Sequence, residues 1–177
     1  MHVFTAIDIQ NQKTLNKLEK LQTELDYNFN KVKPEKMHIT LQFFQNVNQD
    51  EVEEIKSGLQ KISLEPFQIK IEGVGVFPSK DHIRVIWTGI ESEKIFELKN
   101  QVSRHSVEED NGHEFHPHIT LARVQNISKR HRKEFRQKLE KLEDKPIGET
   151  TVNSVKLFKS MQAGNGTKYQ VLEEKKL

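Results

Sequence analysis

Two copies of the tetrapeptide HITL, beginning at His38 and at His118, carry the side chains best suited to chemistry. In a β-strand, residues i and i+2 project from the same face, so each His shares a face with the Thr two positions later, Thr40 or Thr120. The intervening Ile and Leu occupy the opposite face. Imidazole has an unperturbed pKa of about 6.5, so one ring can accept a proton while another donates one near neutral pH. This pattern predicts a cleft that performs general acid and base catalysis.

A phosphodiester fits these groups as a substrate. One His would take a proton from water and the other would give one to the leaving oxygen. The hydroxyls of Thr40 and Thr120 would donate hydrogen bonds to the phosphoryl oxygens. A strained cyclic phosphate is favoured over a linear diester, because it already carries its leaving group and needs only water. This chemistry requires neither a covalent nucleophile nor a metal.

Two arginines are candidates for binding the phosphate. Arg123 ends the run HITLAR, and a guanidinium can donate hydrogen bonds to two oxygens in one plane. In a regular strand its odd number places it on the face opposite His118. Its role therefore requires the strand to end or bulge near Ala122; otherwise Arg123 is a surface charge. Arg84, within the apolar run HIRVIWTGI, either lines the cleft or lies at an exposed position.

The aromatic residues Phe4, Phe43, Phe44 and Trp87 are expected mainly in the core. If one of them stacks on a nucleobase, the alternation of a regular strand favours Phe44, because it then shares the face of His38.

His116 stands two residues before His118, a spacing that occurs among zinc ligands. Three observations argue against a metal site that uses His116 and His118. Lys36 holds the equivalent position before His38, no carboxylate shares that face, and the chain has no Cys. We therefore expect neither a metal nor a cofactor, and we predict that His116 orients His118.

Seven short runs rich in β-branched or aromatic residues predict strands at residues 2–9, 37–44, 66–77, 82–90, 116–124, 150–158 and 167–172. Polar segments with apolar residues at helical spacing predict four amphipathic helices, over residues 11–26, 50–63, 91–106 and 130–143. Asn11, Asn48 or Asp50, and Ser128 are candidate N-caps.

When the sequence is aligned with itself at an offset of 80 residues, each predicted strand or helix falls on another of the same type, and HITL falls on HITL. Such an internal repeat predicts two α+β lobes related by a pseudo-twofold axis. The repeats cover roughly residues 1–80 and 81–160, and the strand of the remaining segment 161–177 would close a sheet beside one lobe. No linker rich in Gly, Pro or Ser separates the repeats, so we expect one domain over residues 1–177.

The 177 residues include 28 Lys and Arg against 26 Asp and Glu, a net charge of +2. This balance argues against a protein that coats nucleic acid nonspecifically, but it allows a local phosphate pocket. The basic stretch 129–145 is expected to be a solvated helix face, with the alternative that it guides an RNA end towards the cleft. No apolar run reaches the roughly 20 residues that span a bilayer, and the start lacks a signal-peptide pattern. We expect a soluble, cytoplasmic protein.

Together with FTAIDI near the start, RVIWTGI in the middle and FHPHITLAR in the second half, the two HxTx motifs resemble those of the two-histidine (2H) phosphoesterases. From Val3 to about Leu172 the chain is most similar to the RNA 2',3'-cyclic phosphodiesterases, the LigT-like branch once described as 2'-5' RNA ligases. The resemblance implies a bilobal α+β fold. Its two antiparallel sheets would form a V-shaped cleft, with one motif from each sheet and helices on the outer faces.

The resemblance also implies metal-independent hydrolysis of an RNA 2',3'-cyclic phosphate end to a 2'-phosphate. His38 matches the proton donor to the leaving 3' oxygen, and His118 matches the acceptor that activates water. Thr40 and Thr120 match the phosphate-binding hydroxyls, and Arg123 matches a basic residue after the second motif.

Two alternatives stay open. One is the reverse reaction, which joins RNA ends in a 2'-5' bond, and the other is a module that binds cyclic phosphates or nucleotides without turnover. The substrate is RNA, a tRNA fragment or a small cyclic nucleotide. We expect a monomer.

Overall fold

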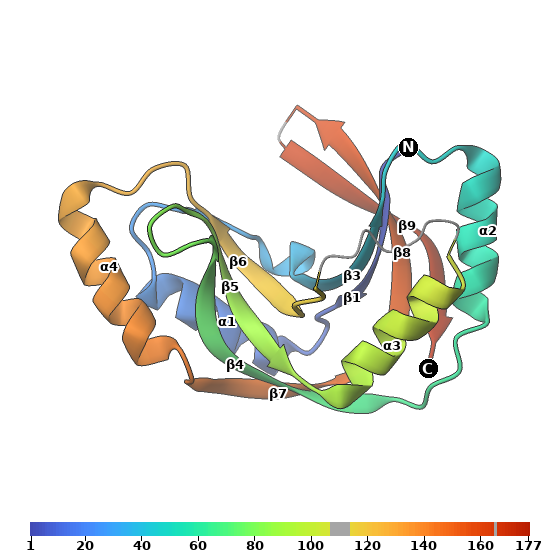
Figure 1. Ribbon diagram of the computed structural model, residues 1–177, viewed down its shortest axis with the longest axis horizontal. Coiled ribbons are helices and arrows are strands. Elements are labelled where there is room, and N and C mark those ends of the chain that lie inside the picture. Colours follow the sequence, from blue (N-terminus) through green and yellow to red (C-terminus); the bar gives the residue numbers. More distant parts are fainter. Residues whose placement is uncertain (107–113, 165) are drawn as a thin grey trace.

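The computed structural model describes residues 1–106, 114–164 and 166–177 of the chain. Within these ranges it contains four α-helices, nine β-strands and one short 3₁₀ helix, Pro34–Lys36. The helices are α1 (Gln12–Glu24), α2 (Gln49–Gln60), α3 (Glu93–Arg104) and α4 (Lys129–Leu142). The strands are β1 (Val3–Asp8), β2 (Asn30–Lys31), β3 (His38–Phe44), β4 (Phe67–Pro78), β5 (Ile83–Glu91), β6 (His118–Arg123), β7 (Pro146–Val152), β8 (Ser154–Ala163) and β9 (Gly166–Lys176). Figure 1 shows their arrangement.

All four predicted helices are present, and three of them begin at predicted caps. The side chain of Asn11 accepts a hydrogen bond from Thr14 N, and Ser128 caps α4 in the same way. Asn48, rather than Asp50, caps α2, in a capping box with Glu51. Each helix buries the apolar stripe that predicted it, because only burial against a sheet stabilises helices of 12 to 14 residues.

The strands form one antiparallel sheet in the order β7-β4-β5-β6-β3-β1-β8-β9, with β2 paired to β6. The predicted α+β class is confirmed. The two expected sheets are joined at their inner edges, where β3 meets β6 through the single pair Ile39 and Ile119. The predicted strand over residues 150–158 is instead two strands, β7 and β8, which are separated at Asn153.

Each half of the sheet is assembled from both sequence repeats. One half, here the β1 half, contains β3, β1, β8 and β9, and the other, the β5 half, contains β6, β5, β4 and β7. The strand that ends the first repeat, β4, pairs with β5, while β8 returns to pair with β1. The predicted repeat boundaries therefore do not coincide with the two halves in space.

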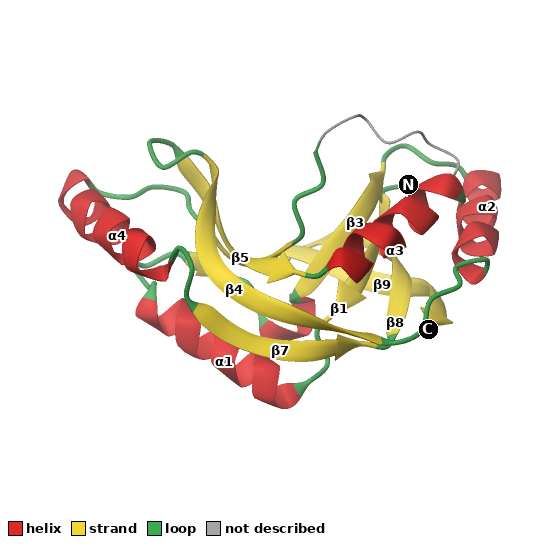
Figure 2. Ribbon diagram, turned by 60° about the horizontal axis from the view of Figure 1, so that its bottom comes forward, coloured by secondary structure: helices red, strands yellow, loops and turns green. Residues whose placement is uncertain are grey.

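The helices also cross between the halves, so that a helix can cover the half opposite to the strand it follows. Although α1 follows β1 in the chain, it packs against β6 and β7, and α3, which follows β5, packs against β3. The β1 half is thus covered by α2 and α3, and the β5 half by α1 and α4 (Figure 2). The segment after residue 160 contains the end of β8 and all of β9, which closes the outer edge of the β1 half as predicted.

The core lies between the helices and one face of the sheet. Ile39 and Ile119 are fully buried there, together with Leu18 of α1 and Phe135 of α4. Because these Ile residues alternate with the His and Thr of the HITL motifs, the motif side chains are left on the other face. Among the described helices, none is long and apolar enough to cross a membrane.

Candidate active site

The two HITL motifs lie on neighbouring antiparallel strands. β3 and β6 meet at Ile39 and Ile119, the second residue of each motif. In an antiparallel register the residues on either side of such a pair also become neighbours. Thr40 therefore lies next to His118, and His38 next to Thr120. All four side chains are half-buried on the face opposite the helices. The arrangement brings two imidazoles and two hydroxyls together around the join between the halves.

A backbone carbonyl fixes the orientation of each imidazole. Nδ1 of His38 lies 2.7 Å from the Lys36 carbonyl oxygen, and Nδ1 of His118 lies 2.7 Å from that of His116. Because a carbonyl oxygen only accepts, Nδ1 of each ring carries a proton and donates it. Nε2 of each ring is then the nitrogen that is left for proton transfer. The orienting group of His118 is thus the backbone of His116 rather than its side chain.

Aromatic side chains enclose both imidazoles. The ring of His38 lies 5.1 Å from Phe4 and 5.5 Å from Tyr169, measured between ring centroids. The ring of His118 lies 5.1 Å from Phe77 and 6.1 Å from Trp87. These apolar neighbours remove water from around the imidazoles and disfavour the charged ring.

Burial lowers the pKa of both histidines below the usual value of 6.5. For His38, the positive charges of His118 and Arg123 lower the pKa further, whereas the bond to the Lys36 carbonyl and the carboxylate of Asp8 raise it. For His118, the bond to the His116 carbonyl raises the pKa and the charge of the His116 ring lowers it. Both rings are therefore mainly neutral at pH 7 in the free protein.

Within the described part of the chain, a carboxylate is the register partner of only one of the two histidines. Asp8 is the register partner of His38 across β1 and β3, and the corresponding partner of His118 across β5 and β6 is Gly89. Asp8 accepts hydrogen bonds from Lys156 at 2.7 Å and from Gln10 at 3.0 Å. Lys156 is only 11% exposed, so its ammonium holds the carboxylate in place.

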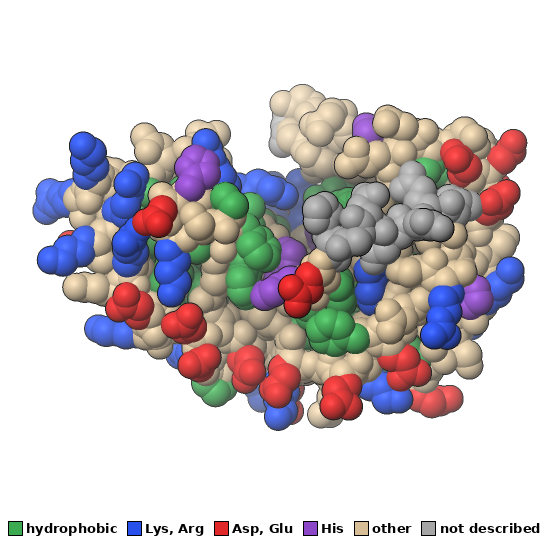
Figure 3. Space-filling view, in the orientation of Figure 1, with side chains coloured by type: hydrophobic (Ala, Val, Ile, Leu, Met, Phe, Trp, Pro, Cys, Tyr) green, Lys and Arg blue, Asp and Glu red, His purple; other side chains and the backbone are tan. Residues whose placement is uncertain are grey.

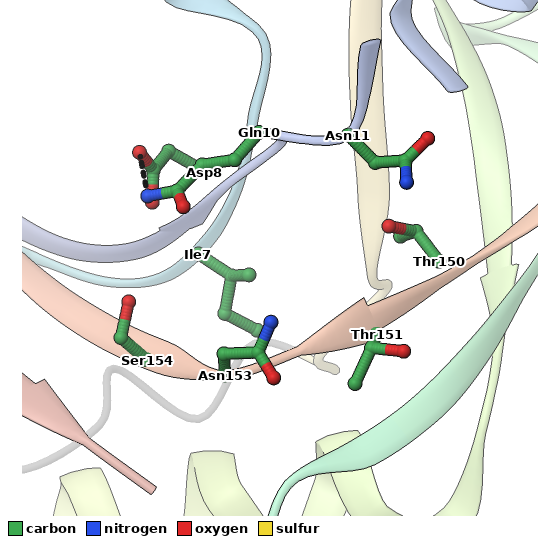
Figure 4. Close-up of a pocket in the computed structure, with 8 residues that line it drawn as sticks. All are labelled: Ile7, Asp8, Gln10, Asn11, Thr150, Thr151, Asn153 and Ser154. Atoms are coloured by element: carbon green, nitrogen blue, oxygen red, sulfur yellow. Dashed lines mark hydrogen bonds between the residues drawn. The ribbon is translucent and has the colours of Figure 1, made fainter. Parts of the chain in front are cut away.

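Asp8 also borders a polar cavity of about 310 Å³, where the end of β1 approaches the β7 to β8 connection. Figure 4 shows Asp8 joined to Gln10 on one side of this cavity, with Thr150, Thr151 and Asn153 along β7 and its end. None of the described histidines lines the cavity, so it is separate from the paired motifs.

A β-bulge in β6 turns Arg123 to the face of His118. Thr120 pairs with Trp87 and Ala122 with Ile86, which leaves Leu121 as the extra residue. Leu121 and Ala122 are both buried, and Arg123 is exposed on the other side. The bulge that the phosphate-binding role requires is present, and Arg123 lies close enough to His38 to lower its pKa.

The same irregularity in β3 makes the prediction for Phe44 wrong. Ala6 pairs with Thr40 and Thr5 with Gln42, so Leu41 is the extra residue of this strand. Phe44 is 1% exposed and belongs to the core, where it cannot stack on a base. Phe43 is instead 62% exposed, and its ring lies 5.7 Å from Phe4. Its expected core position is also wrong.

Arg84 lies at an exposed position, the second of the two placements considered from the sequence. Its Nε donates to Nε2 of His82, and a guanidinium Nη lies 3.4 Å from the Gln125 carbonyl oxygen. It lines a cavity of about 150 Å³ where β5 begins, with Arg132 among the other residues. Arg84 is therefore not among the groups around the two imidazoles.

The His116 ring packs on apolar neighbours, 4.5 Å from Trp87 and 5.7 Å from Phe77 between centroids. Within the described ranges, no three His, Asp or Glu side chains are grouped as a metal site would require. A cavity of about 600 Å³ beside His116 is bordered by several carboxylates, Glu72, Glu91, Glu114, Glu143 and Asp144. Their negative charge makes this cavity unsuitable for a phosphate.

Sequence reasoning missed Asp8, Phe77 and Tyr169. Asp8 could have been found from the sequence. Alternation along the strand FTAIDI places it on the same face as Phe4 and Ala6, and it is the charged residue near the end of that strand. Tyr169 comes from β9, whose position beside β8 depends on the exchange between the halves. No local signal in the sequence brings it to His38.

This fold and this paired site define a family of phosphoesterases. A family model described as LigT like phosphoesterase matches residues 7–87 and 90–169. The chain therefore belongs to the LigT-like phosphoesterase family.

Curated relatives match over nearly the whole chain. A Methanocaldococcus jannaschii protein named RNA 2',3'-cyclic phosphodiesterase is 30% identical over 177 residues, covering 98% of this chain and 99% of the relative. A protein of the same name from Aquifex aeolicus is 32% identical over 173 residues, covering 92% and 90%.

Solved structures share the fold. The protein TT0787 of Thermus thermophilus has a TM-score of 0.83 at 23% identity and covers 100% of this chain and 98% of that one. Escherichia coli LigT complexed with 3'-AMP has a TM-score of 0.77 at 20% identity, with coverage of 99% and 97%.

Proposed function

We propose that this phosphoesterase hydrolyses the 2',3'-cyclic phosphate at the end of an RNA chain and leaves a 2'-phosphate. The observation that carries the proposal is the meeting of two HxT motifs at the Ile39 and Ile119 pair, which makes His38, Thr40, His118 and Thr120 neighbours on one face of the sheet. The names of relatives that cover nearly the whole chain support the RNA 2',3'-cyclic substrate.

In the proposed reaction His118 acts as the general base and His38 as the general acid. Nε2 of His118 takes a proton from water, whose oxygen attacks the phosphorus. The bond from phosphorus to the 3' oxygen breaks, and Nε2 of His38 gives its proton to that oxygen. The products are a 2'-phosphate and a 3'-hydroxyl, and no covalent intermediate forms on the protein.

The surroundings of the two rings support this assignment of roles. Asp8 favours the protonated form of His38, which a general acid needs at the start of the reaction, while the positive charges of His118 and Arg123 oppose that form. Gly89 occupies the corresponding place beside His118, and the positive charge of His116 disfavours protonation there. His118 is therefore better suited to remain neutral and accept a proton. Bound phosphate would further stabilise the His38 imidazolium by its negative charge.

The remaining groups bind the phosphoryl oxygens. The hydroxyls of Thr40 and Thr120 donate hydrogen bonds to them, and Arg123 contributes the positive charge that offsets the charge developing in the transition state. No step of this scheme uses a metal. Catalysis then depends on how the sheet positions these side chains, since every participant is supplied by the chain or by water.

The test uses the full-length protein, EDTA and an oligoribonucleotide that ends in a 2',3'-cyclic phosphate. The expected product is the 2'-phosphate, and His38→Ala or His118→Ala should lower kcat by about 10² to 10⁴. His2→Ala is the control, because His2 is exposed at the start of the chain. Full activity in either active-site variant would contradict the two-histidine mechanism, and loss of activity in EDTA would contradict its independence from metal.

Two further measurements separate the alternatives. Adding an RNA with a 5'-hydroxyl end tests for ligation, which would appear as a longer product with a 2'-5' bond. A binding module would retain the cyclic phosphate and release no product after long incubation.

A further inference from the structure

The positive charge of the chain is concentrated on α4. This helix contains seven Lys or Arg residues and two Glu, a net charge of +5. Because the whole chain has a net charge of +2, the remaining residues together carry −3. Figure 3 shows the Lys and Arg side chains gathered over α4, on the face that is hollowed between the two halves. The near-neutral total therefore conceals one strongly basic surface.

The cations near the start of α4 are not engaged in folding contacts. We define the basic rim as Arg84 of β5 together with four residues of α4, Lys129, Arg130, Arg132 and Lys133. The four α4 residues are exposed, and none of them has an ion pair or side-chain hydrogen bond within the described part of the chain. Further along, Arg136 binds Asp81, and Lys138 lies 4.7 Å from the Tyr27 ring centroid.

Their position also opposes helix stability. The amino-terminal end of a helix carries a partial positive charge, which favours acidic residues in the first turn. α2 has Asp50 and Glu51 there, and α3 has Glu93, whereas α1 and α4 have no acidic residue in their first turns. α4 instead begins with Lys129, Arg130 and Arg132. The cations at this end of α4 repel one another and the helix dipole. Folding does not account for them, but an external polyanion would.

The basic rim is continuous with the catalytic face through the end of β6. Arg123 pairs with Val85, and the next residue, Val124, donates its N–H to the Arg84 carbonyl at 2.9 Å. Arg84 and Arg132 together line the cavity of about 150 Å³ at this edge. Its one carboxylate, Asp81, is bound by Arg136. The cationic surface thus leads from Arg123 over the end of the sheet to α4.

We propose that the basic rim binds the backbone phosphates of the RNA on the 5' side of the reacting end. This inference rests on the proposed function and specifies its substrate as a chain of several nucleotides. A strand rises about 3.3 Å per residue, so the rim begins roughly 15 Å along β6 from His118. A mononucleotide bound at His118 does not reach that far. A longer RNA, whose chain leaves the site through the terminal 5' oxygen, crosses the rim with its phosphates.

The test measures two substrates with the wild-type protein and with one charge-reversed variant. The substrates are adenosine 2',3'-cyclic phosphate and a single-stranded ten-nucleotide RNA with the same end, and the variant is Arg130→Glu/Arg132→Glu/Lys133→Glu. We expect kcat/KM for the ten-nucleotide RNA to fall at least about 10-fold, because three cations that would contact phosphates become anions. Each phosphate contact of a single strand contributes about 0.7 to the dependence of log binding constant on log salt. The slope of log kcat/KM against log salt should decrease by about 2. Turnover of the mononucleotide should not change.

The matched control is Lys61→Glu/Lys94→Glu, which reverses two exposed charges on the β1 half. It should leave the ratio of the two activities unchanged. The melting temperature separates a folding effect from a binding effect, and in the rim variant it should stay the same or rise, since Glu suits the start of a helix.

Equal losses on both substrates, or no loss on the longer one, would overturn the inference while the proposed function stands. If the wild-type protein turns over neither substrate, the proposed function fails. The rim is then judged by fluorescence anisotropy with a labelled ten-nucleotide RNA that ends in a 3'-phosphate. Weaker binding by the rim variant than by the control would support the rim, and equal binding would overturn it.

Discussion

Asp8 faces His38 across β1 and β3, while Gly89 occupies the equivalent place opposite His118. The two halves of the site are therefore alike in their His and Thr residues and different in charge. Lys156, which is 11% exposed, holds the carboxylate at 2.7 Å. Asp8 favours the protonated imidazole of His38, against the opposing positive charges of His118 and Arg123.

The substitution Asp8→Asn should lower the pKa of His38 further and leave that of His118 unchanged. The carboxylate is a charge that raises the His38 pKa, and the amide removes its charge while keeping an oxygen for Lys156. Activity should fall more at pH 7.5 than at pH 6. NMR titration of the His ring protons measures both values. Glu174→Gln is the control, because it neutralises the other carboxylate near Lys156, at 3.8 Å. An unchanged His38 titration in Asp8→Asn would contradict this role.

The fold should lose stability as the pH falls below about 6.5. Burial lowers the pKa of His38 and His118, so the unfolded chain takes up protons at a higher pH than the folded one. The stabilisation is present above the unfolded value and is lost as the pH falls through the folded values. Melting temperatures at pH 7.5 and pH 5.5 measure the effect. In His38→Gln/His118→Gln the difference between the two temperatures should shrink, whereas in His2→Gln it should persist.

Truncation of Phe44 should cost much more stability than truncation of Phe43. Phe44→Ala removes a ring that is 1% exposed and should cost about 3–5 kcal/mol of unfolding free energy. Phe43→Ala removes a ring that is 62% exposed and should change stability by less than about 1 kcal/mol. Urea unfolding of the two variants compares them directly. Similar losses would mean that the bulge at Leu41 is absent in solution.

The substitution Gly75→Ala should disturb the surroundings of His118. A methyl group at this position would overlap the indole of Trp87, the register partner of Gly75. Trp87 contacts His116 and His118, so its displacement should lower kcat and change the tryptophan fluorescence. Gly164→Ala is the matched control, because a methyl group there meets no other atom within 4 Å. Wild-type kcat and fluorescence in Gly75→Ala would show that Trp87 does not support the imidazole.

The parts of this molecule that depend on local patterns could be predicted. The apolar spacing of the helices, the caps Asn11, Asn48 and Ser128, and the alternation within HITL are set by residues a few positions apart. They correctly predicted four helices, the strands that carry the motifs, and the face on which the His and Thr side chains lie.

The bulges could not be predicted from alternation alone. In both strands the extra residue, Leu41 or Leu121, is defined only by the partner strand against which it is counted. The same displacement brings Arg123 to the face of His118 and removes Phe44 from the face of His38. The prediction allowed for a bulge in β6 but not in β3. It therefore gave a correct position for Arg123 and a wrong one for Phe44.

The exchange of elements between the halves determines when this protein can fold during its synthesis. β1 pairs with β8, and β8 begins at Ser154, so the first strand cannot gain this neighbour until Ser154 and the residues after it have been synthesised. The ring of Tyr169, which packs against His38, arrives later still. Contacts between such distant residues form slowly, because a long loop of chain must close before they add stability. The nascent chain should therefore complete its candidate active site only after β9 has been synthesised and has paired with β8.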